Sequence, residues 1–294
     1  MNGAGVLRSA FARGETIVAP GVFDGLSARI VERAGFGAVY ASGGAIARST
    51  GVPDLGLLSL AEVVARLEAI VDAVDVPVVA DADTGFGGAL NVERTVRAFA
   101  RAGVAALHLE DQTFPKRCGH LDGKSLIPVE EMGEKVRAAC EAAGDSGPVI
   151  IARTDAIAVE GFEAALERAR AYAEAGAEML FVEAPTTEPQ IAEIARRVPG
   201  WKLINMFEGG KTPLLSTARL REIGYQLVII PSDLQRAAIR AMERAAGTIR
   251  EEGSTAGFSA NMSSFAERDA LVDTALYLER GFRYSETARE RPRH

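Results

Sequence analysis

The sequence is poor in the residues that build disulfide frameworks or clusters of soft metal ligands. It contains two cysteines and three histidines among 294 residues. Cys118 and Cys140 lie far apart, so no disulfide framework is indicated. Cys140 falls in a helical pattern, where a free thiol is typically a small packing residue. We therefore expect a cytoplasmic protein, because reducing compartments keep cysteines unpaired.

Excess positive charge and long apolar runs are also missing. The net charge is −7, whereas nucleic-acid binding leaves a basic footprint. No run approaches the roughly 20 apolar residues that span a bilayer, and the first residues contain no apolar segment of signal-peptide length. These absences predict that neither nucleic acid nor a membrane is a partner.

What the sequence does contain is an alternation of short apolar strands and longer amphipathic helices. The strands are expected at residues 16–20, 38–41, 77–81, 105–110, 149–153, 179–183, 202–206 and 226–230. The helices are expected to end near residue 35 and to cover residues 60–74, 91–102, 129–143, 162–175, 190–197, 217–223 and 234–252. Asp24 and Ser59 are expected to cap the first two of these helices.

This alternation predicts an α/β fold. Because the strands are apolar almost throughout, they are expected to be parallel and buried on both faces, as in a closed (β/α)8 TIM barrel. A doubly wound open sheet is the alternative, but no glycine-rich dinucleotide loop follows the first strand. We expect residues 1–253 to form the barrel, with a capping helix at 1–14. Residues 254–294 would be a helical extension of the same domain or its oligomer interface.

Polar residues collect where the expected strands end, which is the active-site face of a TIM barrel. They are Tyr40, Ser42, Asp81, Asp83, Glu110, Arg153, Glu183 and Asn205. If strand geometry persists, Asp81 and Asp83 share one face. Converging carboxylates need a cation, and all-oxygen ligands favour Mg²⁺, with Mn²⁺ as a substitute. The alternative is that Asp81 and Asp83 only shape the following glycine-rich turn.

Two further groups could bind an anion. Arg153 ends a strand, where an unpaired charge is costly, and its guanidinium suits a carboxylate. It could instead neutralise Glu183. The backbone of Ser42, Gly43 and Gly44 could present N–H groups to an oxyanion, although an ordinary tight turn has the same sequence.

A reactive cluster follows the fourth strand. Lys116 and Arg117 would lower the pKa of the Cys118 thiol and attract carboxylates, unless they form a solvated loop face. His120 could orient Cys118 or an anion. For Cys118, proton donation is a simpler role than nucleophilic catalysis, because no triad partner is evident. His108 is expected to be a hydrogen-bonded residue of the barrel interior rather than a catalyst.

Together these motifs resemble the isocitrate lyase/phosphoenolpyruvate mutase superfamily. The likeness runs from about residue 15 to residue 280 and rests on the segments YASGG (40–44), DADTGFG (81–87), EDQ (110–112), KRCGH (116–120), ARTDA (152–156) and NM (205–206). The resemblance implies a Mg²⁺-dependent barrel, with Asp81, Asp83 and Glu110 at the metal. It also implies a homotetramer, a dimer of dimers that exchange their C-terminal helices.

The reaction implied is a retro-aldol carbon–carbon cleavage in which Cys118 protonates the leaving carbon. Tyr40, Arg153 and Glu183 are the candidates for the base. The substrate-binding residues would be Ser42, Gly43, Gly44, Gly119, His120, Arg153, Glu183, Asn205 and Phe207. Mutases of phosphorus–carbon bonds generally lack the cysteine, which argues against that reaction.

The substrate is expected to be a di- or tricarboxylate. Phe207 and Phe265 stand where polar carboxylate-binding residues are expected for 2-methylisocitrate, so the resemblance favours an alkylated malate such as 2,3-dimethylmalate. It would be cleaved to a 2-oxo acid such as pyruvate and a carboxylic acid. Cleavage of 2-methylisocitrate to pyruvate and succinate is an alternative, as is hydrolysis or decarboxylation of oxaloacetate. A barrel without catalytic activity is the remaining alternative.

Overall fold

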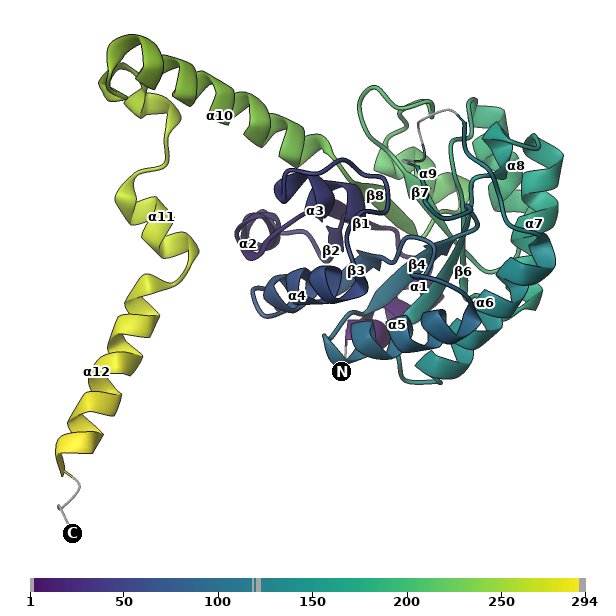
Figure 1. Cartoon of the computed structure of the whole chain (residues 1–294), viewed down its shortest axis with the longest axis horizontal. Helices are drawn as coiled ribbons and strands as arrows, with labels where there is room; N and C mark the ends of the chain where they lie inside the picture. Colours follow the sequence, from purple (N-terminus) through teal and green to yellow (C-terminus); the bar gives the residue numbers. More distant parts are fainter. Residues whose placement is uncertain (1–2, 118, 120–122, 291–294) are drawn as a thin grey trace. The chain divides into compact units, whose positions relative to one another are not determined.

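The computed structural model describes residues 3–117, 119 and 123–290, with side chains as far as residue 285. Eight parallel strands form a closed barrel in the order β1 to β8, and helices surround it (Figure 1). The barrel closes because β1 pairs with β8, from Ile17 opposite Leu227 to Pro20 opposite Ile230. The predicted (β/α)8 fold is confirmed, and the open sheet is excluded.

The strands lie close to their predicted positions. They are β1 (Ile17–Val22), β2 (Val39–Ala41), β3 (Val78–Asp81), β4 (Ala106–Glu110), β5 (Val149–Thr154), β6 (Met179–Val182), β7 (Trp201–Asn205) and β8 (Leu227–Ile230). The helices of the barrel are α1 (Gly3–Ala12), α2 (Gly25–Arg33), α3 (Gly43–Ser49), α4 (Leu60–Val71), α5 (Ala89–Arg101), α6 (Val129–Ala143), α7 (Phe162–Glu174), α8 (Glu188–Arg197) and α9 (Thr217–Ile223), with a 3-10 turn η1 (Ala156–Ala158).

Local capping explains where two of the helices begin. The Asp24 side chain accepts a hydrogen bond from the Ser27 backbone N–H at 2.7 Å. Ser59 and Glu62 form a reciprocal capping box before α4, in which the Ser59 backbone N–H donates to the Glu62 carboxylate at 2.8 Å. Both predicted N-caps are confirmed, since each satisfies an N–H group that has no partner within its helix.

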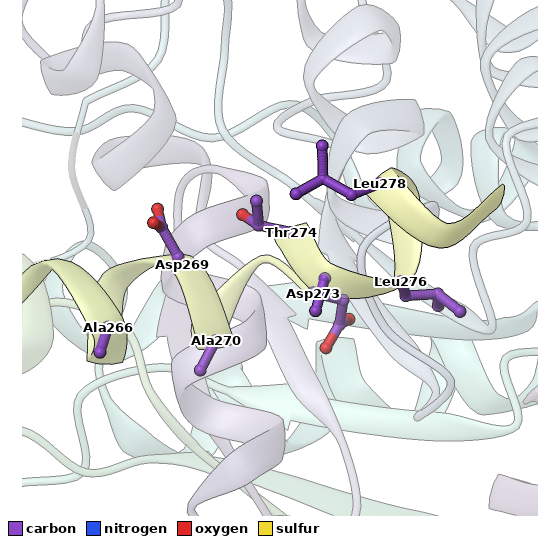
Figure 2. A pocket seen from close by; sticks show the side chains of 8 residues that line it. Ala266, Asp269, Ala270, Asp273, Thr274, Leu276 and Leu278 are labelled. Atoms are coloured by element: carbon purple, nitrogen blue, oxygen red, sulfur yellow. The ribbon is translucent and has the colours of Figure 1, made fainter. Parts of the chain in front are cut away.

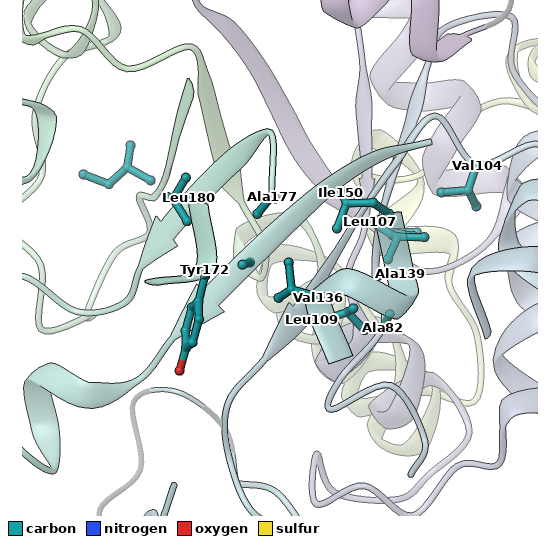
Figure 3. Packing of buried hydrophobic residues seen from close by; sticks show 14 of the residues in the cluster. Ala82, Val104, Leu107, Leu109, Val136, Ala139, Ile150, Tyr172, Ala177 and Leu180 are labelled. Carbon is teal, nitrogen blue, oxygen red and sulfur yellow. The ribbon is translucent and has the colours of Figure 1, made fainter. Parts of the chain in front are cut away.

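Side chains alternate between two apolar layers. Leu107 and Leu109 of β4 point outward and belong to the same cluster as Val136 and Ala139 of α6 (Figure 3). Ala106 points inward and belongs to the barrel interior. His108 and Glu110 therefore also face the interior, as the period of two predicts. Leu7 and Phe11 of α1 belong to the interior cluster as well, so α1 closes the end of the barrel opposite the strand C-termini.

The chain divides into two compact units, Met1–Arg236 and Ala237–His294. The helices after β8 are α10 (Asp233–Glu252), η2 (Ala256–Asn261), α11 (Phe265–Leu271) and α12 (Thr274–Glu290). Between α11 and α12 lies a shallow hollow of about 570 Å³, lined mainly by alanine and leucine (Figure 2). Among the described residues, no helix combines the length and apolarity needed to cross a membrane. The division predicted after residue 253 stays a prediction.

Candidate active site

Inward-facing polar side chains gather at the C-terminal ends of the barrel strands. Asp81, Glu110 and Asn205 are the last residues of β3, β4 and β7. Tyr40 and Arg153 lie on β2 and β5, and Glu183 directly follows β6. The most exposed of these residues, Asn205, is 9% exposed. The structure thus brings the predicted strand-end residues into one buried site.

Arg153 is held by two carboxylates. The parallel register of β4 and β5 places it opposite Glu110, and its Nη1 lies 3.3 Å from Glu110 Oε2. Its Nε and Nη2 donate to the two oxygens of Asp155 at 3.0 and 3.2 Å. The guanidinium also lies 5.0 Å from the centre of the Phe181 ring. Burial alone would lower the pKa of Arg153, but the surrounding carboxylates raise it well above its usual value, so the group stays charged.

Lys116 occupies the centre of the carboxylate cluster. Its Nζ lies 2.7 Å from Asp83 Oδ1 and also contacts Asp54 Oδ1, and the residue is only 4% exposed. Burial favours the neutral amine, yet the carboxylates around it raise its pKa well above the usual value. The alternative of a solvated loop face is therefore wrong for Lys116. Asp54 was not predicted from the sequence; the proline–aspartate turn at residues 53–54 is the weak signal that marks it.

Asp81 and Asp83 do not continue one strand face. β3 ends at Asp81, and Asp83 adopts a left-handed backbone with φ of 46°, which is uncommon outside glycine. The Asp83 backbone N–H donates to Asp81 Oδ1 at 3.0 Å. The expectation of persisting strand geometry is therefore wrong, and Asp81 does shape the turn. The turn nevertheless leaves the Asp83 carboxylate in the site, against Lys116.

The cluster offers the kind of oxygen ligands that hard cations bind. Asp54, Asp81, Asp83 and Glu110 supply only oxygen, and Glu110 Oε1 is buried without a hydrogen-bond partner among the described residues. Within that part of the chain, no three aspartate, glutamate, histidine or cysteine side chains are grouped closely enough to ligate an ion. The Lys116 ammonium lies between Asp54 and Asp83 and contacts both carboxylates.

Gly43 and Gly44 begin helix α3, which was not predicted from the sequence. Ser42 caps this helix by accepting from the Ala45 backbone N–H at 3.3 Å. A Cβ atom on Gly43 would lie 2.7 Å from Asp81 Oδ2, and one on Gly44 would lie 2.7 Å from Asp54 Oδ2. A side chain at either position would press on these carboxylates, because they pack directly against the glycine backbone.

Tyr40, His108 and Asp81 form a buried hydrogen-bonded group. Tyr40 Oη lies 2.8 Å from His108 Nε2 and 3.3 Å from Asp81 Oδ2. Burial, reinforced by nearby cations, lowers the pKa of His108 to about 4 despite Asp81, so the imidazole is neutral at pH 7. Burial and the Asp81 charge raise the pKa of Tyr40 well above 10. The expectation of a hydrogen-bonded histidine in the barrel interior holds at Nε2.

The remaining predicted residues are placed unevenly. A Cβ atom on Gly119 would strike Arg153 Nη2 and lie 3.0 Å from Glu183 Oε1, so this backbone rests on the site. Asn205 Nδ2 lies 3.4 Å from the same Glu183 oxygen. Phe207 is half-buried, two residues beyond β7. Cys118 and His120 lie outside the described residues.

Comparison with known proteins identifies the family. Residues 7–250 match the family model described as phosphoenolpyruvate phosphomutase. The chain belongs to the PEP mutase/isocitrate lyase superfamily. It is 44% identical to 2,3-dimethylmalate lyase of Eubacterium barkeri over 273 residues, covering 92% of this chain and 94% of that protein. It is 46% identical to 2-methylisocitrate lyase of Aeropyrum pernix over 285 residues, covering 97% and 92%. The prediction of a lyase of this superfamily is confirmed.

Solved structures of the superfamily superpose closely on this chain. The crystal structure of 2,3-dimethylmalate lyase has a TM-score of 0.89 at 37% identity and covers 95% of this chain and 94% of its own. Oxaloacetate acetylhydrolase with 3,3-difluorooxalacetate also has a TM-score of 0.89, at 33% identity, covering 95% and 97%. Phosphonopyruvate hydrolase with oxalate and Mg²⁺ has a TM-score of 0.87 at 32% identity, covering 97% and 99%.

Proposed function

We propose that this lyase cleaves the carbon–carbon bond of a 2-hydroxy dicarboxylate, such as an alkylated malate resembling 2,3-dimethylmalate. The products would be a 2-oxo acid such as pyruvate and a carboxylic acid. The observation that carries the proposal is the fixed, buried guanidinium of Arg153 beside a cluster of oxygen ligands. That pairing suits a substrate with one carboxylate to anchor and a neighbouring oxygen to polarise.

The donor set supports Mg²⁺ as the cofactor, with Mn²⁺ as a substitute. Asp81 and Asp83 would hold the ion, and Glu110 would act through water. When bound, the ion would polarise the 2-oxygen of the substrate and stabilise negative charge that develops there. The Glu110 oxygen that has no hydrogen-bond partner in the described part of the chain supports this assignment, as does the Mg²⁺ in phosphonopyruvate hydrolase.

The chain's own residues would divide the remaining tasks. Arg153 and the backbone of Ser42, Gly43 and Gly44 would bind the carboxylate next to the hydroxyl carbon. Tyr40 and Arg153 keep their protons because their pKa values are raised. Of the three candidate bases, Glu183 therefore suits the role best.

The reaction needs one base to remove a proton and one acid to supply one. Glu183 would take the hydroxyl proton, directly or through water. The C2–C3 bond would then break, forming the 2-oxo group and leaving the electron pair on C3. The Cys118 thiol would protonate that carbon, and His120 would help to bind the substrate. Proton exchange with water would restore both groups.

Substrate length separates the alternatives. By the resemblance, Phe207 and Phe265 stand at positions where handles for a third carboxylate are expected, which favours an alkylated malate over 2-methylisocitrate. Cleavage of 2-methylisocitrate is an alternative because the chain is 46% identical to a 2-methylisocitrate lyase. Hydrolysis of oxaloacetate is another because of the structural likeness to oxaloacetate acetylhydrolase.

A substrate panel tests the proposal. Purified protein with Mg²⁺ would be offered 2,3-dimethylmalate, citramalate, malate, 2-methylisocitrate and oxaloacetate, with products identified by NMR and a matched series in EDTA. We expect the alkylated malate to give the highest kcat/KM, and only with metal. Preference for 2-methylisocitrate by orders of magnitude would overturn the substrate assignment. Acetate plus oxalate from oxaloacetate would indicate the hydrolase, and pyruvate plus CO₂ the decarboxylase. No turnover of any compound would indicate a barrel without activity.

A homotetramer is the proposed assembly, with C-terminal helices exchanged between subunits in a cytoplasmic protein. The C-terminal unit carries apolar side chains that are largely exposed, including Phe265 at 77% and Phe282 at 73%. Surfaces of this kind typically mark contacts with a partner. Light scattering after size-exclusion chromatography would measure the mass. A monomer at micromolar concentration would contradict this assembly.

A further inference from the structure

One buried carboxylate joins two cations that meet over the site. Asp155 accepts hydrogen bonds from Arg153 Nε and Nη2 and, at 2.8 Å, from Lys124 Nζ. The Lys124 side chain is 1% exposed and that of Asp155 is fully buried. Lys124 Nζ also donates to the backbone carbonyl of Gly119. Asp155 thus connects Arg153 to the backbone segment that rests on it.

Asp155 is itself held from behind. Its backbone N–H donates to Asp111 Oδ1 at 3.0 Å. The other Asp111 oxygen accepts from the Thr154 hydroxyl at 2.7 Å and the Tyr172 hydroxyl at 2.8 Å. Tyr172 lies on α7, so the outer helix layer fixes the position from which Asp155 acts. None of these contacts involves a residue assigned above to proton transfer.

The geometry restricts how Arg153 can meet a ligand. A guanidinium presents its hydrogen-bond donors along fixed edges. Asp155 takes the Nε–Nη2 edge of Arg153. A substrate carboxylate can therefore approach only the end formed by Nη1 and Nη2. Glu110 lies on the Nη1 side, and the Gly119 backbone lies against Nη2.

We propose that Asp155 is a positioning residue with two roles. This proposal rests on the function proposed above. It orients Arg153 so that the Nη1–Nη2 end receives the substrate carboxylate. Through Lys124 it also holds the Gly119 backbone against that guanidinium. Loss of the first role weakens carboxylate binding, and loss of the second role slows turnover.

Three variants distinguish the orientation of Arg153 from the hold on the Gly119 backbone. In Asp155→Asn the neutral amide cannot pair with both cations, so the Kd for oxalate with Mg²⁺, measured by calorimetry, should rise about tenfold or more. In Lys124→Met, Arg153 keeps Asp155, so this Kd should change less than about threefold while kcat falls about 10- to 100-fold. Lys124→Arg should recover most of kcat, because it restores the charge and a donor.

Arg8→Met is the matched control. Arg8 also binds a carboxylate, Glu178 at 2.7 Å, and a backbone carbonyl, that of Gly147 at 2.9 Å, but does so away from the site residues. It should lose stability while keeping kcat, KM and oxalate binding. A Lys124→Met enzyme with kcat within about twofold of the Arg8→Met enzyme would overturn the second role, the hold on the Gly119 backbone. Unchanged oxalate binding in Asp155→Asn would overturn the first.

Hydrogen exchange gives a readout that needs no substrate. Peptides covering residues 112–126 should exchange faster in Lys124→Met than in wild type or Arg8→Met, because the Gly119 carbonyl loses its donor. Unchanged exchange would refute the role of Lys124, even if the protein turned over none of the compounds in the panel. If Asp155→Asn does not fold, Asp155→Glu takes its place in the oxalate measurement, because its longer side chain displaces the carboxylate that orients Arg153, and the Lys124 variants still test the hold on the Gly119 backbone. A failed panel together with faster exchange would count against the substrate assignment and not against the positioning role.

Discussion

Replacing Lys116 with methionine removes the ammonium group that contacts both Asp54 and Asp83 while keeping a long side chain. Removing one partner of a buried ion pair costs about 3–5 kcal/mol. The Asp54 and Asp83 side chains remain 13% and 19% exposed, so part of their charge stays solvated and the lower end applies. We expect the free energy of unfolding to fall by about 3 kcal/mol in EDTA, which lowers Tm by on the order of 5–10 °C.

Mg²⁺ should reverse this loss. With the ammonium gone, an ion can bind the cluster without displacing Lys116, so Mg²⁺ should stabilise the Lys116→Met protein more than wild type. At 100 times Kd the gain is about 2.7 kcal/mol. Thermal unfolding with EDTA and with rising Mg²⁺ measures both effects.

Lys135→Met is the matched control for this experiment. Lys135 is 5% exposed, close to the 4% of Lys116, but its Nζ donates to the Thr84 carbonyl at 3.1 Å rather than to a carboxylate. Burial lowers its pKa, so its charge is already disfavoured. This variant should show no Mg²⁺-dependent recovery. The reasoning is refuted if Lys116→Met is as stable as wild type in EDTA, or if Mg²⁺ shifts Tm equally in both lysine variants.

Three shorter predictions address the loop and the thiols. Gly119→Ala should lower kcat/KM about tenfold or more, because the new methyl group presses on Arg153. Gly133→Ala, whose Cβ would meet only side-chain atoms at 3.6 Å or more, should leave kcat/KM unchanged; equal losses would contradict the contact. Cys118→Ser should reduce turnover about 10²-fold or more, and full activity would remove the proton-donor role. Burial raises the pKa of Cys140 to about 11. In native Cys118→Ser protein, this remaining thiol should therefore react with a disulfide reagent at pH 8 about 100-fold more slowly than after unfolding, and its rate should rise as the pH approaches 11. Equal rates in the native and unfolded protein would refute this prediction.

Much of the barrel could be read along the chain. Apolar strands alternate with amphipathic helices, and this periodicity is local, so it predicts both the elements and their order. The same period of two predicts that His108 and Glu110 face inward, as they do. The parts that failed depend on backbone choices with no such period, such as the left-handed turn at Asp83 and the short helix that begins at Gly43.

By itself, the sequence determined the fold class, the superfamily and the residues that line the strand ends, because periodicity and motifs are local properties of the chain. Tertiary structure alone decided their partners. The register of β4 and β5 sets Glu110 beside Arg153, and packing of distant loops brings Lys116 to Asp54. In the sequence Asp155 is only one residue of a motif, and its partner Lys124 is set by the fold. Such ion pairs join residues far apart in the chain, and only the packed barrel brings their charges within reach of one another.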